Sequence, residues 1–293
     1  SSDVCSSDLA FPMKYKIISD SSSDVTQAFF AGETAFEYGV VPMSINGPGG
    51  LSYLDLDPTP ARYFVEKPRE IKGQWSSSCP SPAAYLKEMQ GAEEIFVVTI
   101  SSRLSASYST ACMAADMARA ENPDVKIHVV DSKSASSGMA LMVFKLAELC
   151  REGLPFEKIV EKIEEFRKGH TLYFLIGSLE TLVSAGRMNR VVGMMATMLN
   201  IHPLCGEDGD GNIKVYQKVR GMTQALNRLV EMVGERGETL GRHLVISQCN
   251  NPEDAEMLSK ACQRRYQFAK ISVLEMRGLA SFYAGDRGLI LAY

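Results

Sequence analysis

The sequence has no long apolar run and no excess of basic residues. Its apolar stretches, such as 139–144 and 172–176, fall far short of the ~18 residues that span a membrane. The chain carries 31 basic and 35 acidic residues and a net charge of −4. Because neutralising nucleic-acid phosphates requires a basic face, we expect neither a nucleic-acid partner nor an integral membrane segment.

Paired cysteines and histidines with metal or disulfide spacing are also absent. The seven cysteines are scattered without a Cys-x-x-Cys pair, and no two of the four histidines have zinc spacing. Disulfide frameworks are typical of small secreted chains, so we interpret these cysteines as free thiols in a reducing compartment. No metal site is predicted.

Several catalytic and nucleotide-binding motifs are missing. No Gly-Lys dipeptide provides a Walker A loop, no Gly-x-Gly-x-x-Gly follows a strand, and no Gly-x-Ser-x-Gly elbow occurs. The segment that starts at Asp208 resembles a calcium loop. It has Ile213 where such a loop needs glycine and Val219 where it needs glutamate, so a hairpin turn is the better interpretation.

The length of 293 residues favours two domains, since single cores tend to divide beyond about 250 residues. The first twelve residues lack the basic start and apolar core of a secretory signal. We interpret them as a cloning remnant before a native start at Met13, and we expect a cytoplasmic protein. The predicted domains are residues 13–168 and 169–293.

The first of these segments repeats a strand, a turn of small polar residues and a helix three times. The predicted strands are 14–19, 93–100 and 125–130, which indicates an α/β domain with a doubly wound, Rossmann-like parallel sheet. Ligands of such sheets bind beyond the carboxyl ends of the strands. The turns Asp20–Asp24, Ser101–Ser107 and Asp131–Ser137 would all open there.

The pattern changes after residue 168. Strands are predicted at 173–177, 202–204, 213–219, 243–248, 270–276 and 289–293, and helices at 191–200, 223–233 and 252–268. The turn-rich stretch 206–212 is predicted to join two of these strands. This order indicates a two-layer α/β domain with a mixed sheet.

Hydroxyl groups gather in two segments, 76–82 and 101–108. Serines near a helix N-terminus can hold an anion without a basic side chain, because free amide groups and the helix dipole favour negative charge. Serines also cap helices in most proteins, and Ser81 before Pro82 fits that simpler role. Spacing alone leaves both interpretations open.

At these residues the sequence resembles the DegV family of bacterial proteins, and the matching motifs span nearly the whole of 13–293. The motifs are Asp20-Ser21-x-x-Asp24, Ser77-Ser78-x-Pro80-Ser81, Ser101-Ser102-x-Leu104-Ser105-x-x-Tyr108, Asp131-Ser132, Ser178-Leu179-x-x-Leu182 with Gly186-Arg187-Met188, Leu199-Asn200-Ile201-x-Pro203 and Val219-Arg220-Gly221.

The resemblance implies a carrier that binds one long-chain fatty acid and needs no other cofactor. The carboxylate would lie between the domains and the tail would be buried. A separate ATP-dependent kinase subunit would phosphorylate the bound acid, as in bacterial fatty acid kinase systems, while the carrier itself has no catalytic turnover. Carried over, Ser77 and Ser105 would be the main carboxylate ligands, with Ser78, Ser102 and Ser107 close by.

The chain departs from the family pattern at the same site. Ser77 replaces the usual threonine and keeps its hydroxyl, whereas Cys79 replaces glutamine. Tyr283 occupies the position of a family histidine near the head group. We predict that its phenol contacts the carboxylate, and the loss of the imidazole weakens the case for phosphorylation by a partner.

Other residues carry two interpretations each. A methionine-rich helix could form a flexible wall for the tail or an ordinary core, and its residues are Met194, Met195, Met198, Leu199 and Ile201. Asp20, with Ser21 beside it, could cap a helix or orient the serines. Arg187 could be a surface charge, a partner-docking residue or a head-group ligand.

Two other functions compete with the carrier. One is a serine-dependent phosphotransferase or hydrolase of small molecules, and the other is a regulatory binding module. A serine nucleophile needs a base within reach. No histidine falls in the predicted strand-end turns, which favours the carrier.

Overall fold

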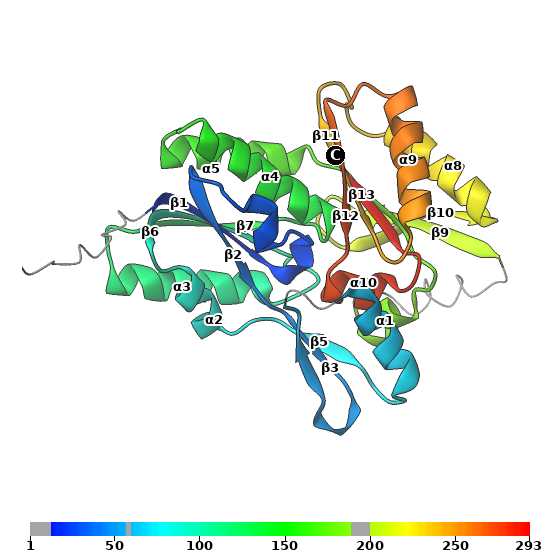
Figure 1. Cartoon of the computed structure of the whole chain (residues 1–293), viewed down its shortest axis with the longest axis horizontal. Coiled ribbons are helices and arrows are strands. Elements are labelled where there is room, and N and C mark those ends of the chain that lie inside the picture. Colours follow the sequence, from blue (N-terminus) through cyan, green and yellow to red (C-terminus); the bar gives the residue numbers. More distant parts are fainter. Residues whose placement is uncertain (1–12, 57–59, 189–199) are drawn as a thin grey trace, which may run out of the picture.

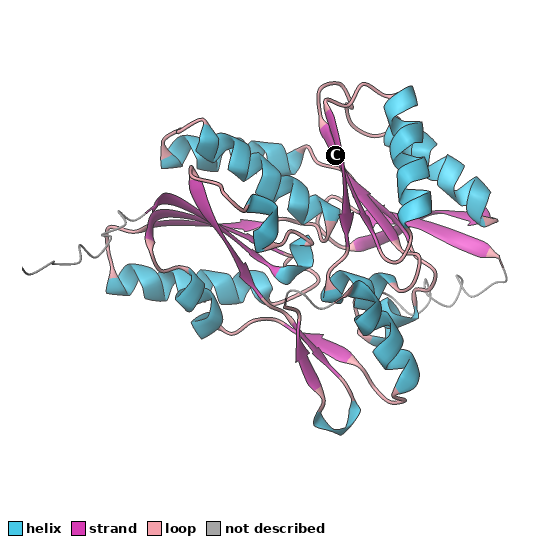
Figure 2. Cartoon of the chain, viewed as in Figure 1, coloured by secondary structure: helices cyan, strands magenta, loops and turns pink. Residues whose placement is uncertain are grey.

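Two β-sheets dominate the computed structural model, which describes residues 13–56, 60–188 and 200–293 (Figures 1 and 2). The first sheet is parallel and has the strand order β2-β1-β6-β7. Its strands are β1 (Met13–Asp20), β2 (Phe36–Val41), β6 (Ala92–Thr99) and β7 (Lys126–Asp131). The chain order reverses between β1 and β6, and this switch point is where such sheets bind ligands.

Helices cover both faces of the first sheet because its strands are apolar on both sides. Ile18 packs with helices α2 and α3, whereas its neighbour Ile17 belongs to the core around α4. The helices are α2 (Pro82–Glu88), α3 (Ser107–Glu121), α4 (Ser137–Arg151) and α5 (Phe156–Lys168). The predicted doubly wound domain is confirmed.

The second sheet is mixed and has the order β10-β9-β8-β13-β11-β12, in which only β11 and β12 pair in parallel. Its strands are β8 (Leu172–Leu175), β9 (Ile201–Glu207), β10 (Ile213–Arg220), β11 (His243–Gln248), β12 (Lys270–Glu275) and β13 (Leu289–Ala292). Helices α8 (Met222–Val233) and α9 (Pro252–Arg265) pack on one face. The predicted mixed sheet is confirmed.

Helix α4 lies between the two sheets and packs on both (Figure 1). A helix with neighbours on opposite sides must be apolar around its circumference. The run Met139–Val143 is accordingly buried without interruption. Val245, Leu274 and Ala292 of the second sheet belong to the same core as α4. The two sheets lie on either side of the predicted boundary at residue 168, but they share this core.

Several elements were not predicted from the sequence. They are β2, the antiparallel sheet of β3 (Ser44–Asn46), β4 (Ser52–Leu54) and β5 (Ser76–Ser78), and the helices α1 (Ala61–Glu70) and α10 (Gly278–Ala284). The short helix α6 (Glu180–Ser184) ends just before Gly186. The predicted helix over 191–200 falls almost wholly outside the described residues.

Helix α1 packs against α10, so a segment from the first half of the chain contacts the second (Figure 1). This contact brings the small sheet, which carries Ser77, next to the helix that carries Tyr283. The two halves of the candidate site therefore depend on how α1 and α10 meet.

The position of α4 predicts how sensitive the fold is to truncation there. Replacing Met142, which is 0% exposed, with alanine should lower the free energy of unfolding by about 2–5 kcal/mol through lost burial and a cavity. Met113 on α3 is 58% exposed, and Met113→Ala should change it by less than about 0.5 kcal/mol. Urea unfolding of both variants tests this; equal losses would contradict the shared core.

Candidate functional site

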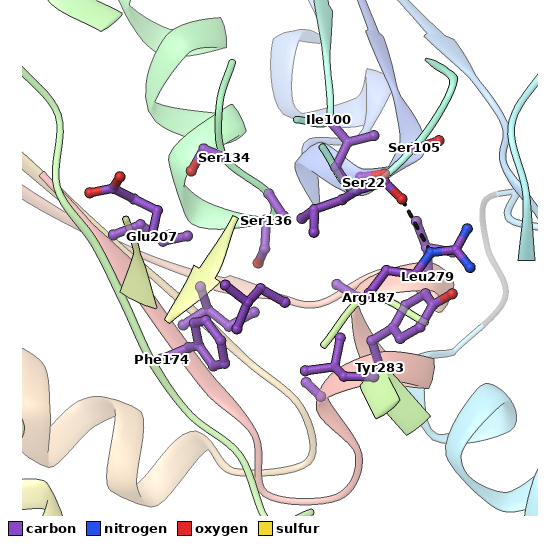
Figure 3. Close-up of a pocket in the computed structure, with 18 of the residues that line it drawn as sticks. Ser22, Ile100, Ser105, Ser134, Ser136, Phe174, Arg187, Glu207, Leu279 and Tyr283 are labelled. Atoms are coloured by element: carbon purple, nitrogen blue, oxygen red, sulfur yellow. Dashed lines mark hydrogen bonds between the residues drawn. The ribbon is translucent and has the colours of Figure 1, made fainter. Parts of the chain in front are cut away.

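A largely apolar cavity lies between the carboxyl ends of the first sheet and one face of the second (Figure 3). The space inside it, counted with the open solvent at its mouth, is about 880 Å³. Ser22 follows β1, Ser105 follows β6 and Ser136 follows β7, and all three line it. The expectation that the three strand-end turns open onto one site is confirmed.

Strand β8 provides much of the apolar wall. Leu172 and Phe174, together with Ile176 just beyond the strand, line the cavity. The alternate residues Tyr173 and Leu175 belong to the core beneath α8, because successive side chains of a strand point to opposite faces. Other apolar lining residues are Leu182, Ile213, Leu279 and Ile290.

Tyr283, Arg187 and Ser105 lie toward the same side of the cavity, and Ser134, Ser136 and Glu207 lie toward the other (Figure 3). The hydroxyl groups of Ser77 and Tyr283 form a hydrogen bond of 2.8 Å. Ser105 and Arg187 line the same cavity, and Arg187 Nε donates to the Leu104 carbonyl at 3.2 Å. Two hydroxyl-bearing elements and a guanidinium thus converge where the two domains meet.

A buried carboxylate holds the loop that carries Ser105. Asp20 accepts hydrogen bonds from Ser22 N at 3.1 Å, from Ile100 N at 2.9 Å and from Ser107 Oγ at 2.7 Å. Burial raises the pKa of Asp20, and these hydrogen bonds oppose the rise. Asp20 therefore both caps the turn after β1 and ties it to the end of β6.

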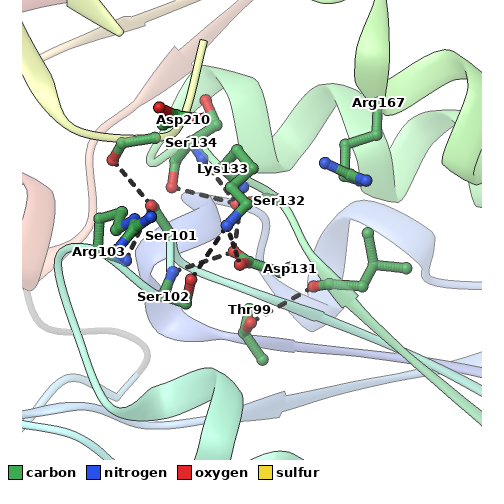
Figure 4. Close-up of polar contacts among 12 residues, drawn as sticks. Thr99, Ser101, Ser102, Arg103, Asp131, Ser132, Lys133, Ser134, Arg167 and Asp210 are labelled. Atoms are coloured by element: carbon green, nitrogen blue, oxygen red, sulfur yellow. Dashed lines mark hydrogen bonds and ion pairs between the residues drawn. The ribbon is translucent and has the colours of Figure 1, made fainter. Parts of the chain in front are cut away.

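Three predicted serines do not line the cavity. Ser78 is exposed and accepts from Asn46 Nδ2 at 2.7 Å, because it faces away from Ser77 on β5. Ser102 accepts from Lys133 Nζ at 3.2 Å (Figure 4), and the buried Ser107 is bonded to Asp20 and to Tyr85. The geometry therefore does not support a direct contact between these three serines and the carboxylate of a ligand in the cavity.

The other predicted site residues do not line the cavity themselves or lie outside the described residues. Ser21 Oγ accepts from the backbone N–H of Met43 at 3.0 Å, and Met43 lines the cavity, so Ser21 acts through a neighbour. Ile201 begins β9 but does not line the cavity. The other predicted tail-lining residues, Met194, Met195, Met198 and Leu199, lie outside the described residues.

A second buried cluster joins the two domains beside the cavity. Asp24 accepts from Ser136 Oγ and from Arg277 N, the latter at 2.8 Å. The carboxylate of Asp55 accepts from Gly278 N at 2.9 Å and from Leu279 N at 3.0 Å, which caps α10. Sequence reasoning missed this cluster, since its members lie far apart in the chain.

The titration of Asp24 gives a prediction. Burial raises the pKa of Asp24 to about 7 from the usual 3.8, so the folded state retains its proton longer than the unfolded state. Its contribution to stability is complete below about pH 4 and is lost as the pH rises through about 7. Between pH 5 and 8 the free energy of unfolding should therefore fall less in Asp24→Asn than in the wild type. The difference between the two slopes should reach up to about 1.4 kcal/mol per pH unit.

Urea unfolding at several pH values tests the Asp24 prediction. The side chain of Asp116 is 79% exposed, and Asp116→Asn should leave the pH profile of the wild type unchanged. An Asp24→Asn profile parallel to that of the wild type would contradict the assignment.

Within 13–56, 60–188 and 200–293 no group of three histidine, cysteine, aspartate or glutamate side chains is placed to hold a metal ion. None of the helices described there is both long enough and apolar enough to span a bilayer.

The fold and this cavity define a two-domain α/β protein with an apolar site between its sheets. The sequence model described as "Uncharacterised protein, DegV family" matches residues 14–293, and the chain belongs to the DegV family. A DegV domain-containing protein of Streptococcus gordonii is 35% identical over 283 residues, covering 96% of this chain and 99% of that protein.

Solved structures share the whole fold. The Streptococcus pneumoniae fatty acid kinase B3 protein loaded with linoleic acid is 32% identical, with a TM-score of 0.89 over 96% of this chain and 99% of that one. A DegV family protein of Ruminococcus gnavus, refined with vaccenic acid, is 30% identical, with a TM-score of 0.88 over 96% and 100% of the two chains. The predicted family is confirmed.

Proposed function

We propose that this chain binds one long-chain fatty acid in the cavity between its sheets. The carboxylate lies at the end formed by Ser77, Ser105 and Tyr283, and the tail runs along the apolar wall that β8 provides. The observation that carries the proposal is an apolar cavity with the hydroxyl groups of Ser77, Ser105 and Tyr283 in its lining, those of Ser77 and Tyr283 in direct contact. The linoleic and vaccenic acids of the two similar structures support it.

The energetics of such a ligand are favourable. Burying each methylene contributes roughly 0.8 kcal/mol, so a tail of about 15 methylenes contributes on the order of 10 kcal/mol before association costs. The same cavity filled with water instead of the tail would lack this favourable free energy. The tail therefore supplies most of the affinity, and the polar end fixes the orientation of the acid.

The head-group ligands are mainly neutral. Serine and tyrosine hydroxyls donate hydrogen bonds to a carboxylate without neutralising its charge. The guanidinium of Arg187 is partly engaged by the carbonyls of Leu104 and Ala185. A carboxylate held in this way keeps the nucleophilic oxygen that a phosphoryl acceptor needs.

We further propose that the chain presents this carboxylate to an ATP-dependent kinase partner as a non-catalytic carrier. The name of the Streptococcus pneumoniae protein supports this role. No histidine lines the described part of the cavity, so Ser77 and Ser105 have no imidazole base beside them for a reaction of their own. Dependence on ATP places the proposed reaction in the cytoplasm.

Serine variants test the head-group assignment. Ser77→Ala and Ser105→Ala should each weaken binding of a fluorescent fatty acid about ten- to a hundredfold, since a hydrogen bond to a charged group contributes roughly 1.5–3 kcal/mol. Ser78→Ala is the matched control from the opposite face of β5 and should bind normally. Unchanged affinity in both site variants, with unchanged melting temperatures, would show that the serines only cap and connect.

Tyr283 gives a separate prediction. Phenols in general ionise far above neutral pH, so a head-group site with a tyrosine and no histidine should bind with little change between about pH 6 and 8. Tyr283→Phe should weaken binding about as much as a serine deletion, because it removes the partner of Ser77. Tyr283→His should make binding depend on pH in this range, since imidazole titrates there. Titrations at pH 6, 7 and 8 measure both effects, and a flat profile for the histidine variant would contradict contact with the carboxylate.

A further inference from the structure

A second cleft lies on the other side of Glu207 from the cavity between the two sheets. It is formed by the C-terminal end of α5 and residues 169–171 after it, the turn of the β9–β10 hairpin and the loop after α8. Its volume is about 800 Å³ including its opening. Lys133 and Glu207 line both cavities, so the two share a wall. Nothing in the proposed carrier function uses this second cleft.

The lining of the cleft is strongly basic in a chain whose net charge is −4. Its cationic side chains are Lys133, Arg167, Lys168 and Arg236. Lys133 pairs with Asp131 at 2.8 Å (Figure 4), and Arg167 pairs with Glu164 at 2.8 Å. Among the described residues, no carboxylate lies within ion-pair distance of Lys168 or Arg236, both exposed at the rim.

Glu207 is the one acidic residue in the described lining of the cleft, and it is 7% exposed. Its carboxylate points away from the cavity between the two sheets (Figure 3) and accepts a hydrogen bond from Gly209 N. A buried carboxylate repels an anion that has no proton to share. It accepts a hydrogen bond from an anion that retains an O–H group.

This combination selects among anions. Hydrogen phosphate retains an O–H near neutral pH and sulfate does not, whereas a phosphate monoester, whose second pKa is about 6, retains one only in its monoanionic form. Arginine and lysine bind the remaining oxygens. His170 is the only aromatic ring in the described lining, so the cleft offers no apolar ring for a nucleobase to stack on.

We propose that this cleft binds a protonated phosphate group, either hydrogen phosphate or the monoanionic form of a small monoester. Lys168 and Arg236 neutralise its charge from the rim, and the Glu207 carboxylate accepts a hydrogen bond from its O–H group at the floor. The site is independent of the proposed fatty acid site, although the two share the Lys133–Glu207 wall.

Calorimetric titration of the full chain at low ionic strength tests the proposal with three probes: inorganic phosphate, glycerol phosphate and sulfate. Phosphate should bind saturably at one site, and sulfate about tenfold or more weakly. Tighter binding of glycerol phosphate than of phosphate would identify a monoester as the ligand, and the reverse would identify free phosphate. The absence of saturable binding by either phosphate probe would overturn the proposal.

Variants locate the binding. Lys168→Gln and Arg236→Gln should each weaken phosphate binding about tenfold and leave fatty acid affinity unchanged. Arg264→Gln removes an exposed cation on α9 and should change neither. Phosphate binding that survives both cleft variants would place the site elsewhere and contradict the proposal.

Glu207→Gln tests the source of selectivity, with a melt to confirm that the variant folds. Removing the buried charge should bring sulfate to within a few-fold of phosphate. Equal binding of sulfate and phosphate by the wild type would refute the role of Glu207. If the variant does not fold, that comparison in the wild type alone decides the question.

Discussion

The carboxylate of Asp20 sits at the switch point of the parallel sheet and holds the ends of β1 and β6 together. Its hydrogen bonds to Ile100 N and Ser107 Oγ fix the loop that carries Ser105. The carbonyl of Leu104 in that loop accepts from Arg187, which belongs to the other domain. One buried group therefore positions the head-group end of the cavity and a contact between the domains.

The cavity exists because neither domain closes it alone. Strand-end turns of the first sheet form one wall, and β8 with α10 forms the other. Helix α4 packs on both sheets, while Asp24 and Asp55 bind backbone amides at the start of α10. Buried carboxylates that accept backbone hydrogen bonds fix the geometry of the junction, and shared apolar packing supplies its stability.

Local sequence was sufficient for the parts of the fold with strong periodicity. The apolar runs of β1, β6 and β7 and the serine-rich turns after them predicted the sheet edge where Ser105 lies. Strand β2 was missed because Glu37 and Gly39 interrupt its apolar pattern. Residues 172–176 are all apolar, so the sequence shows no alternation there, and only the tertiary fold shows that Leu172 and Phe174 are on the face of β8 that lines the cavity.

The site itself was partly predictable. The resemblance to the DegV family singled out Ser77 and Tyr283, whose hydroxyls lie 2.8 Å apart across 206 residues of sequence. The difference between Ser77 and Ser78 depends on how β5 pairs with β3, where Ser77 is opposite Ile45. The contacts of Asp55 with α10 join residues more than 220 positions apart, and no local pattern predicts such a pairing.

We propose that the cavity between the two sheets holds a fatty acid. Organic extraction of the gently purified full chain, followed by mass spectrometry with a quantified internal standard, tests it most directly. We expect about one long-chain fatty acid per chain, displaced from the Ser77→Ala variant more readily than from Ser78→Ala. Extracts that contain no fatty acid, from protein that also fails to bind added fatty acid, would contradict it.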